Sequence, residues 1–290
     1  MNLQEIVGGI EMIPKVIHYC WFGYGEKSAL VKKCIQSWRE KFPNYEIKEW
    51  NESNFDVTQN IYMKEAYECK KWAFVSDYAR LQIIYTYGGI YFDTDVEVIK
   101  NFEPLIKENG YLCFENLTNE EFGQQVGTGL GFAAEAKNKV IGKMLEEYEG
   151  IHFITNGEMD LTPCPVRNTE ALRKMGLITD GRMQKIENII VYPFEYFCGY
   201  DIANSYLVNS KNTYTIHHYS ATWKAKMGLI EWIKYKIVVK VIQKLIGYEY
   251  NPKMADAICE GHMFNEIAKR FFKIVNMSDD LCEVYGIKKR

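Results

Sequence analysis

The chain has 290 residues, of which 47% are hydrophobic and 14% aromatic, so it can bury a full core and is not a disordered protein. Its net charge of -3 argues against a dedicated nucleic-acid binder, which would carry a basic excess. No stretch reaches the ~20 uninterrupted apolar residues of a membrane span, and we expect no secretory signal at the start.

The first half of the chain alternates strand and helix patterns, which is typical of a parallel α/β sheet. Glycines at 88 and 89 end one of these helices, because glycine accepts the left-handed conformation of a helix C-cap. Strands are predicted at 15–22, 45–50, 90–92, 111–115, 130–134, 189–192 and 214–217, and helices at 27–41, 60–70, 72–87, 137–148 and 169–175.

The character of the sequence changes after Trp223. In 229–246 the apolar residues fall on one helical face and Lys236, Lys240 and Lys244 on another. Two interpretations stay open for this basic helix: its apolar stripe packs on the main domain, or it rests on an anionic membrane surface. The predicted domains are an N-terminal extension at 1–12, a main domain at 13–225 and a C-terminal helical extension at 226–290.

The eight cysteines lie at long, irregular intervals, with no Cys-x-x-Cys pair. This spacing favours buried free thiols over a disulfide framework or a zinc site. Since free thiols persist in reducing compartments, we expect a cytoplasmic protein.

Asp93 and Asp95 follow the predicted strand at 90–92, at the edge of an open α/β sheet where ligands bind. Carboxylates at i and i+2 of a strand project to the same side and can jointly hold a hard divalent cation. Two other interpretations stay open: a solvated turn, or the nucleophile loop of a haloacid-dehalogenase-type phosphatase, in which Asp93 attacks a phosphoryl group and Asp95 is its acid/base partner. That loop normally opens its fold, whereas more than 90 residues precede Asp93.

Three further sets of residues are candidates for a ligand site. Asp77 and Arg80 lie one turn apart on the helix before the aspartates, either as an ion pair or as groups that bind sugar hydroxyls and phosphate. His217 and His218 close a later strand, and one of them could be a third metal ligand, which would favour Mn²⁺ over Mg²⁺. Trp21 ends the first strand, either as core filling or as a platform that stacks on a base.

Four segments carry a resemblance to a known family: IPKVIHYCWFG (13–23), AFVSDYARL (73–81), YGGIYFDTD (87–95) and IHHYSATW (216–223). In this order they resemble the motif series of the DXD-containing glycosyltransferases of family 32, most closely the bacterial capsular-polysaccharide-type sugar transferases. The resemblance implies a GT-A fold, which is a Rossmann-like α/β architecture with a mixed, mostly parallel sheet flanked by helices.

The resemblance also implies an activity. A hexosyl or N-acetylhexosaminyl group would pass, with retention at the anomeric carbon, from a nucleotide sugar to a hydroxyl of a saccharide acceptor, in the synthesis of capsule or other cell-surface polysaccharide. The expected donor is a UDP-sugar, with GDP as the alternative, and the expected cofactor is Mn²⁺ or Mg²⁺. The acceptor could be lipid-linked, with the helix at 229–246 touching the inner face of the membrane. Two other function classes stay open: an aspartate-nucleophile phosphatase or phosphotransferase, and a carbohydrate-binding protein without turnover.

The residues that resemble the family's nucleotide site come from the first and third motifs. Trp21 would stack on the nucleobase, and the backbone of Ile17, His18 and Tyr19 would read the edge of the base. Tyr91 would approach the phosphates or the ribose.

The residues that resemble its catalytic centre are Asp77, Arg80, Asp93 and Asp95. Asp77 and Arg80 would hold the donor sugar. Asp95 would bind the metal directly, whereas Asp93 would reach the ribose and contact the metal indirectly.

The last motif would complete the site. His218 resembles the family's metal-binding histidine, with His217 as the substitute, and Ser220 and Trp223 would close over the diphosphate. One departure is the Gly-Thr-Gly segment at 127–129, which stands where related enzymes place an asparagine-containing loop beside the donor sugar. No residue is identified as a general base, and Glu115 is a candidate only as the next carboxylate at a strand end.

Overall fold

The computed structural model describes residues 13–106, 110–119, 123–201, 206–207 and 211–219. The chain divides into two compact units, 1–218 and 219–290, and the described residues belong to the first unit apart from Tyr219. The predicted extension at 1–12, the basic helix at 229–246 and the rest of 226–290 lie outside the described residues, so the predicted domain division stays a prediction.

The central sheet has eight strands. They are β1 Val16–Cys20, β2 Glu46–Trp50, β3 Gly89–Tyr91, β5 Gly110–Asn119, β6 Gly123–Val126, β7 Phe132–Ala134, β10 Gln184–Ile186 and β11 Ile189–Tyr192. Their order is β10-β11-β5-β7-β3-β1-β2, with β6 beside β5. β1 pairs in parallel with β2 and β3, β11 pairs in parallel with β5, and β7 runs antiparallel between β3 and β5. Because β1, β2, β3, β5 and β11 therefore share one direction, the predicted mixed, mostly parallel α/β sheet is confirmed.

Three small two-stranded sheets were not predicted as such. They pair β4 Val96–Val98 with β14 Thr215–His217, β8 Ile154–Thr155 with β9 Glu158–Met159, and β12 Tyr200–Asp201 with β13 Tyr206–Leu207. The β4–β14 pair is antiparallel and sets His217 opposite Val96. The strand predicted at 214–217 thus leaves the central sheet and lies against the segment that follows Asp95.

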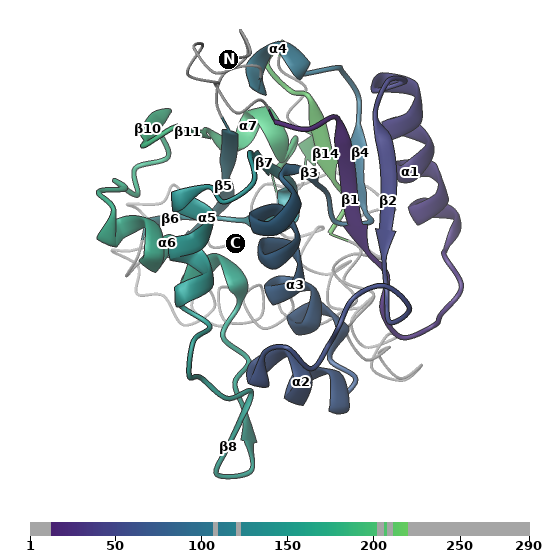
Figure 1. Cartoon of the computed structure of the whole chain (residues 1–290). Helices are drawn as coiled ribbons and strands as arrows, with labels where there is room; N and C mark the ends of the chain where they lie inside the picture. The colour runs from purple at the N-terminus through teal and green to yellow at the C-terminus, as the bar shows by residue number, and fades with distance from the viewer. Residues whose placement is uncertain (1–12, 107–109, 120–122, 202–205, 208–210, 220–290) are drawn as a thin grey trace, which may run out of the picture. The chain divides into compact units, whose positions relative to one another are not determined.

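Helices flank the sheet (Figure 1). They are α1 Ala29–Lys41, α2 Ile61–Glu68, α3 Trp72–Tyr87, α4 Glu103–Ile106, α5 Lys139–Glu146, α6 Cys164–Lys174 and α7 Phe194–Phe197, with a 3₁₀ turn at Thr128–Leu130. None of the helices in the described ranges is both long enough and apolar enough to cross a membrane.

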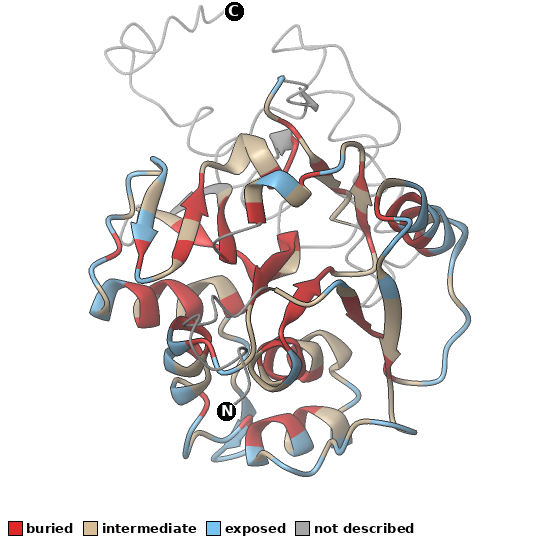
Figure 2. Cartoon of the chain, turned by 45° about the horizontal axis from the view of Figure 1, so that its top comes forward, coloured by how far each residue is buried: buried red, intermediate tan, exposed pale blue. Residues whose placement is uncertain are grey.

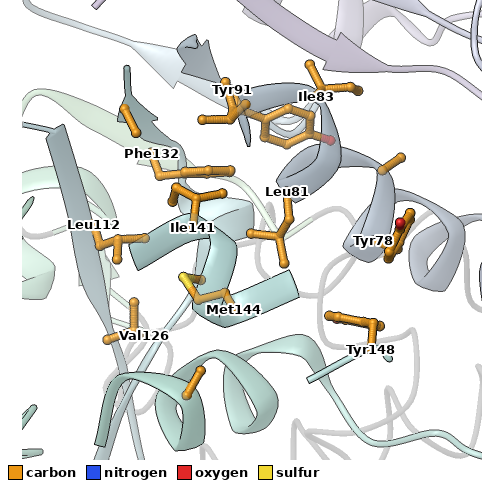
Figure 3. Close-up of a cluster of buried hydrophobic side chains, with 14 of the residues drawn as sticks. Tyr78, Leu81, Ile83, Tyr91, Leu112, Val126, Phe132, Ile141, Met144 and Tyr148 are labelled. Atoms are coloured by element: carbon orange, nitrogen blue, oxygen red, sulfur yellow. The ribbon is translucent and has the colours of Figure 1, made fainter. Parts of the chain in front are cut away.

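Helix α3 is central to one half of the core. Its apolar side chains pack with α5 and with strands of the sheet, as Figure 3 shows for Leu81, Ile83, Phe132, Ile141 and Met144. On the other face of the sheet, rings from separate elements pack together, and Tyr111 stacks on Phe197 at 4.2 Å between ring centres. In Figure 2 the central strands and the inner sides of these helices are accordingly red.

The end of α3 is fixed by the glycines that the sequence indicated. Gly88 has a φ of 65° and Gly89 a φ of 108°, both in the region that favours glycine. A Cβ at Gly89 would lie 2.7 Å from the Val16 carbonyl oxygen, so this close approach of β3 to β1 requires glycine.

The side chain of His18 has a structural role at the same junction. Its Nδ1 accepts a hydrogen bond from Trp50 Nε1 at 3.0 Å, so the protonated Nε2 donates to the Gly88 carbonyl at 2.9 Å. Burial, helped by the charge of Lys48 and opposed by the bond to Gly88, lowers the pKa of His18 to about 4. His18 is therefore neutral near pH 7.

Acidification should weaken the fold through His18. Between pH 6.5 and 4 the unfolded chain protonates this histidine and the folded chain does not, so the free energy of unfolding falls as the pH falls. The full effect of the shift is about 3 kcal/mol. Urea unfolding at pH 7.0 and 4.5 should therefore show a smaller loss in His18→Gln than in the wild type. His152→Gln, at a side chain that is 55% exposed, is the control and should keep the wild-type loss; equal losses in all three proteins would contradict the role of His18.

The position of β1 corrects one prediction about the nucleotide site. Ile17 and His18 pair with β2 on one side and with β3 on the other, and the His18 carbonyl accepts from Phe92 N at 3.0 Å. In a strand with neighbours on both sides, the backbone groups are used within the sheet. The backbone of Ile17 and His18 is therefore not available to read a base. Tyr19 lies beyond the last pair with β3, and its hydroxyl donates to Glu49.

Candidate active site

Arg80 connects the two acidic motifs. Its Nη2 lies 3.0 Å from Asp77 Oδ1 on the same helix and 3.2 Å from Asp93 Oδ1 beyond β3. Its Nε donates to the Ser76 carbonyl at 3.1 Å, and its guanidinium carbon lies 5.3 Å from the centre of the Tyr91 ring. Only 4% of the Arg80 side chain is exposed. The sequence predicted that Asp77 and Arg80 share a helix face, and the structure shows that the pair also holds the first aspartate of the DXD motif.

Asp93 is held from three sides. Besides Arg80, the Tyr91 hydroxyl donates to Asp93 Oδ1 at 3.1 Å. On the third side lies Gly129, where a Cβ would come within 2.6 Å of Asp93 Oδ2. Burial raises the pKa of Asp93, although the charge of Arg80 acts in the opposite direction.

Asp95 has a different set of neighbours. The chain between β3 and β4 is a turn, in which Val96 N donates to the Asp93 carbonyl at 3.1 Å. The two aspartates therefore follow β3 in a turn, and the prediction that they end an extended strand is wrong. Asp95 Oδ1 lies 3.2 Å from Nε2 of His217, which ends β14, the antiparallel partner of β4.

His217 belongs to this cluster electrostatically as well. Burial would lower its pKa, but the carboxylates of Asp95 and Asp93 outweigh that effect and raise it. The pKa of Glu115 is raised to about 7 by burial, and the positive charges of His217 and Arg80 oppose that rise. The carboxyl groups of Asp77, Asp93, Asp95 and Glu115 thus interact in one region with Arg80 and His217.

The structure places His218 elsewhere. Its Nε2 lies 2.8 Å from Glu97 Oε2, which also accepts from Lys33 Nζ at 2.7 Å. The predicted metal ligand His218 is therefore directed away from Asp95, and His217, the named substitute, takes its place as the candidate ligand.

The donor set fits a divalent cation in part. Two adjacent ligands of an octahedral Mg²⁺, each at about 2.1 Å, lie about 3 Å apart. Asp95 Oδ1 and His217 Nε2, at 3.2 Å, match that separation. No group of three histidine, cysteine or carboxylate side chains suited to an ion occurs in the described ranges. The chain itself would thus fill two neighbouring positions, and the diphosphate of a donor would fill others.

Residues that the sequence did not single out line the other side of Arg80. Thr128 Oγ1 accepts from Arg80 Nη1 at 3.4 Å and from Asn168 Nδ2 at 3.1 Å, and Cys164 Sγ lies 3.8 Å from Arg80 Nη1. Asn168, on α6, thus lies against the Gly-Thr-Gly segment at 127–129. The only sequence signal was the glycine pair around Thr128, because Gly127 and Gly129 let the backbone approach Glu115 and Asp93 closely.

Trp21 lies at the end of β1 and is partly exposed. Its Nε1 donates to the Gly25 carbonyl at 2.7 Å, and the Lys27 ammonium lies 5.3 Å from its ring centre. The indole is thus held in place without being buried in the core, as a stacking platform requires. Ser220 and Trp223, predicted to close over a diphosphate, lie outside the described residues.

Comparison with known protein families found a match to part of the chain. Residues 28–112 match the family described as "Glycosyltransferase sugar-binding region containing DXD motif". The matched stretch contains Asp77, Arg80, Asp93 and Asp95. It supports a glycosyltransferase with a DXD motif, a class that generally uses a divalent metal and a nucleotide sugar.

Solved structures and curated sequences were compared as well. "PaToxG Glycosyltransferase" is similar at 19% identity and a TM-score of 0.40, over 57% of this chain and 70% of that one. A glycosyltransferase "involved in the glycosylation of the major capsid of PBCV-1" is similar at 10% identity and a TM-score of 0.40, over 70% of this chain and 93% of that one. No curated protein sequence matches the chain.

Proposed function

We propose that this chain is a metal-dependent, retaining glycosyltransferase of family 32 that moves a sugar from a UDP-sugar to a hydroxyl of a saccharide acceptor. One observation carries the proposal: Arg80 joins the helix pair Asp77–Arg80 to the DXD turn, next to Asp95 and His217. A capsular or other cell-surface polysaccharide as product extends the proposal on the strength of the sequence motifs, and a cytoplasmic site of action extends it on the spacing of the cysteines.

The chemistry follows from the charges that this region holds. Departure of a nucleoside diphosphate leaves negative charge on phosphate oxygens, and a bound Mn²⁺ or Mg²⁺ stabilises that charge as a Lewis acid. Asp95 and His217 are the residues that would hold the ion. Asp93 is already bound by Arg80 and Tyr91, so it suits an indirect role toward the ion and the ribose.

Arg80 and Asp77 bind the sugar of the donor. The carboxylate of Asp77 can accept hydrogen bonds from sugar hydroxyls. Because Arg80 is fixed by two carboxylates and by its own helix, its charge is oriented before the donor binds, which is the condition for effective electrostatic catalysis. The burial of these groups also limits water, which would otherwise hydrolyse the donor.

A panel of UDP- and GDP-sugars, each with and without Mn²⁺, tests the proposal. A donor at 100 times its Kd adds about 2.7 kcal/mol to the stability of the folded state. We therefore expect one nucleotide sugar to raise the melting temperature by about 5–10 °C when Mn²⁺ is present, and to be hydrolysed slowly to the nucleoside diphosphate. Release of phosphate from sugar phosphates would instead support a phosphatase, and binding of free saccharides alone would support a protein without turnover.

A further inference from the structure

A second polar cluster lies beside Asp77 and is not used by the chemistry above. We call it the tyrosine–arginine cluster; it consists of Tyr62 on α2, Tyr148 after α5 and Arg167 on α6. The Arg167 guanidinium carbon lies 5.5 Å from the centre of the Tyr62 ring and 5.6 Å from that of Tyr148, and the two rings lie 5.2 Å apart. In Figure 3 Tyr148 lies near Tyr78 of α3, the residue after Asp77, and their ring centres are 5.8 Å apart.

Electrostatic effects link this cluster to Asp77. Burial and, next, the charge of Asp77 raise the pKa of the Tyr62 hydroxyl, and Asp77 likewise acts on Tyr148. Burial raises the pKa of Asp77 to about 6, while the positive charges of Arg80 and Arg167 lower it. The two tyrosine hydroxyls and Arg167 are thus within electrostatic reach of the carboxylate proposed to bind the sugar.

Four buried polar atoms of the cluster and of Asn168, the residue after Arg167 on α6, have no hydrogen-bond partner within the described part of the chain. They are the hydroxyls of Tyr62 and Tyr148, Nε of Arg167 and Oδ1 of Asn168. Tyr62 and Tyr148 are fully buried and Asn168 is 1% exposed. Because an unpaired buried polar atom is costly, a local concentration of such atoms points to a polar group that binds among them.

The charges of the region restrict what that group can be. Arg167 is paired with Asp160, and Arg80 is paired with both Asp77 and Asp93. Three carboxylates therefore face two guanidinium groups, and a further negative charge would be repelled. The ligand group is expected to be uncharged, with both donors and acceptors, as sugar hydroxyls are.

We propose that Tyr62, Tyr148, Arg167 and Asn168 form a subsite for the uncharged sugar of the donor, beside Asp77. This inference rests on the proposed function and adds the residues that select the sugar. The tyrosine hydroxyls and Arg167 Nε donate to sugar oxygens, and Asn168 Oδ1 accepts from a sugar hydroxyl. A sugar that lacks one of these groups binds more weakly, because the matching polar atom of the site is then left unpaired.

The test compares the affinity for a nucleotide sugar with the affinity for the free nucleotide. Calorimetric titration in Mn²⁺ measures the Kd values of UDP-glucose, GDP-mannose and UDP-glucuronate, and of UDP and GDP, for the wild type, Tyr62→Phe and Tyr148→Phe. We expect each variant to bind the preferred neutral nucleotide sugar about 3- to 10-fold more weakly and to bind the free nucleotide unchanged. UDP-glucuronate should bind no more tightly than UDP.

Tyr111→Phe is the matched control. Its hydroxyl is also buried without a described partner, but its ring stacks on Phe197 on the other face of the sheet. It should leave every Kd unchanged. Since each substitution removes only an unpaired hydroxyl, the melting temperatures of the free proteins should not fall, which separates a binding defect from a folding defect.

The outcomes distinguish failure of the proposed subsite from failure of the proposed glycosyltransferase function. Wild-type affinity of Tyr62→Phe and Tyr148→Phe for a neutral nucleotide sugar that the wild type binds would overturn the subsite and leave the proposed function standing. Tighter binding of UDP-glucuronate than of UDP-glucose would overturn the assignment to an uncharged sugar. A wild-type protein that binds nucleotides but gains nothing from any attached sugar would overturn both proposals.

Discussion

Replacement of Asp95 by asparagine should reduce kcat/KM for the nucleotide sugar on the order of 10³-fold, because a Lewis-acid contribution of several kcal/mol is lost with the charge that holds the ion. Asparagine has nearly the same shape as aspartate, and its oxygen can still face His217, 3.2 Å away in the wild type. The folded structure should therefore persist, with a melting temperature close to that of the wild type. The measurement is release of nucleoside diphosphate over a range of Mn²⁺ concentrations.

Glu97→Gln is the matched control for this prediction. Glu97 lies two residues after Asp95, in β4, and its carboxylate also contacts a histidine, at 2.8 Å from His218 Nε2. It should keep activity within about 3-fold, as expected for a partly exposed surface pair.

The two histidines extend the comparison. His217→Gln should lose activity as Asp95→Asn does, and His218→Gln should retain it as Glu97→Gln does. The opposite result, an active His217→Gln and an inactive His218→Gln, would show that His218 is the metal ligand. Full activity of Asp95→Asn would place the metal away from the DXD turn.

The sequence predicted the long elements of the fold well. Helix α3 spans Trp72–Tyr87 and strand β11 spans Ile189–Tyr192, as expected. Their apolar runs and the glycines after α3 are local signals that need no knowledge of a partner. Short strands such as β4 and β10 were missed, since three residues become a strand only through the neighbour they pair with.

The same difference between local signals and distant partners decides which contacts of the site were predictable. The contact of Asp77 with Arg80 follows from their spacing on one helix, so it was predictable. The choice between His217 and His218 depends on the register of β14 against β4, and a shift of one residue would exchange the two side chains. Thr128 contacts Arg80, and Asn168 contacts Thr128, from elements far apart in the sequence, so no local pattern could bring these residues together.

Replacement of Arg80 by methionine should lower the free energy of unfolding by about 3–5 kcal/mol, because it leaves the buried carboxylate of Asp77 and the partly buried carboxylate of Asp93 without their shared cation. Asp77 is 7% exposed, and both it and Asp93 contact Arg80 Nη2 at 3.0 and 3.2 Å. The same substitution should abolish binding of the nucleotide sugar. Urea unfolding at pH 7 measures the first effect and calorimetric titration the second. Arg182→Met is the control, because Arg182 is paired with Asp180 but 83% exposed, and its loss should leave both measurements unchanged.

A second variant separates lost charge compensation from lost packing. If the destabilisation comes from uncompensated carboxylates, then Asp77→Asn in the Arg80→Met background removes one of them and should restore part of the stability, although Asp77→Asn alone destabilises the wild type by breaking the pair. If the guanidinium mattered only by filling space between Tyr91 and Thr128, the two substitutions would add, and the double variant would be the less stable protein. Recovery in the double variant without recovery of donor binding would therefore identify Arg80 as the cation that both makes this acidic region stable and presents it to the sugar.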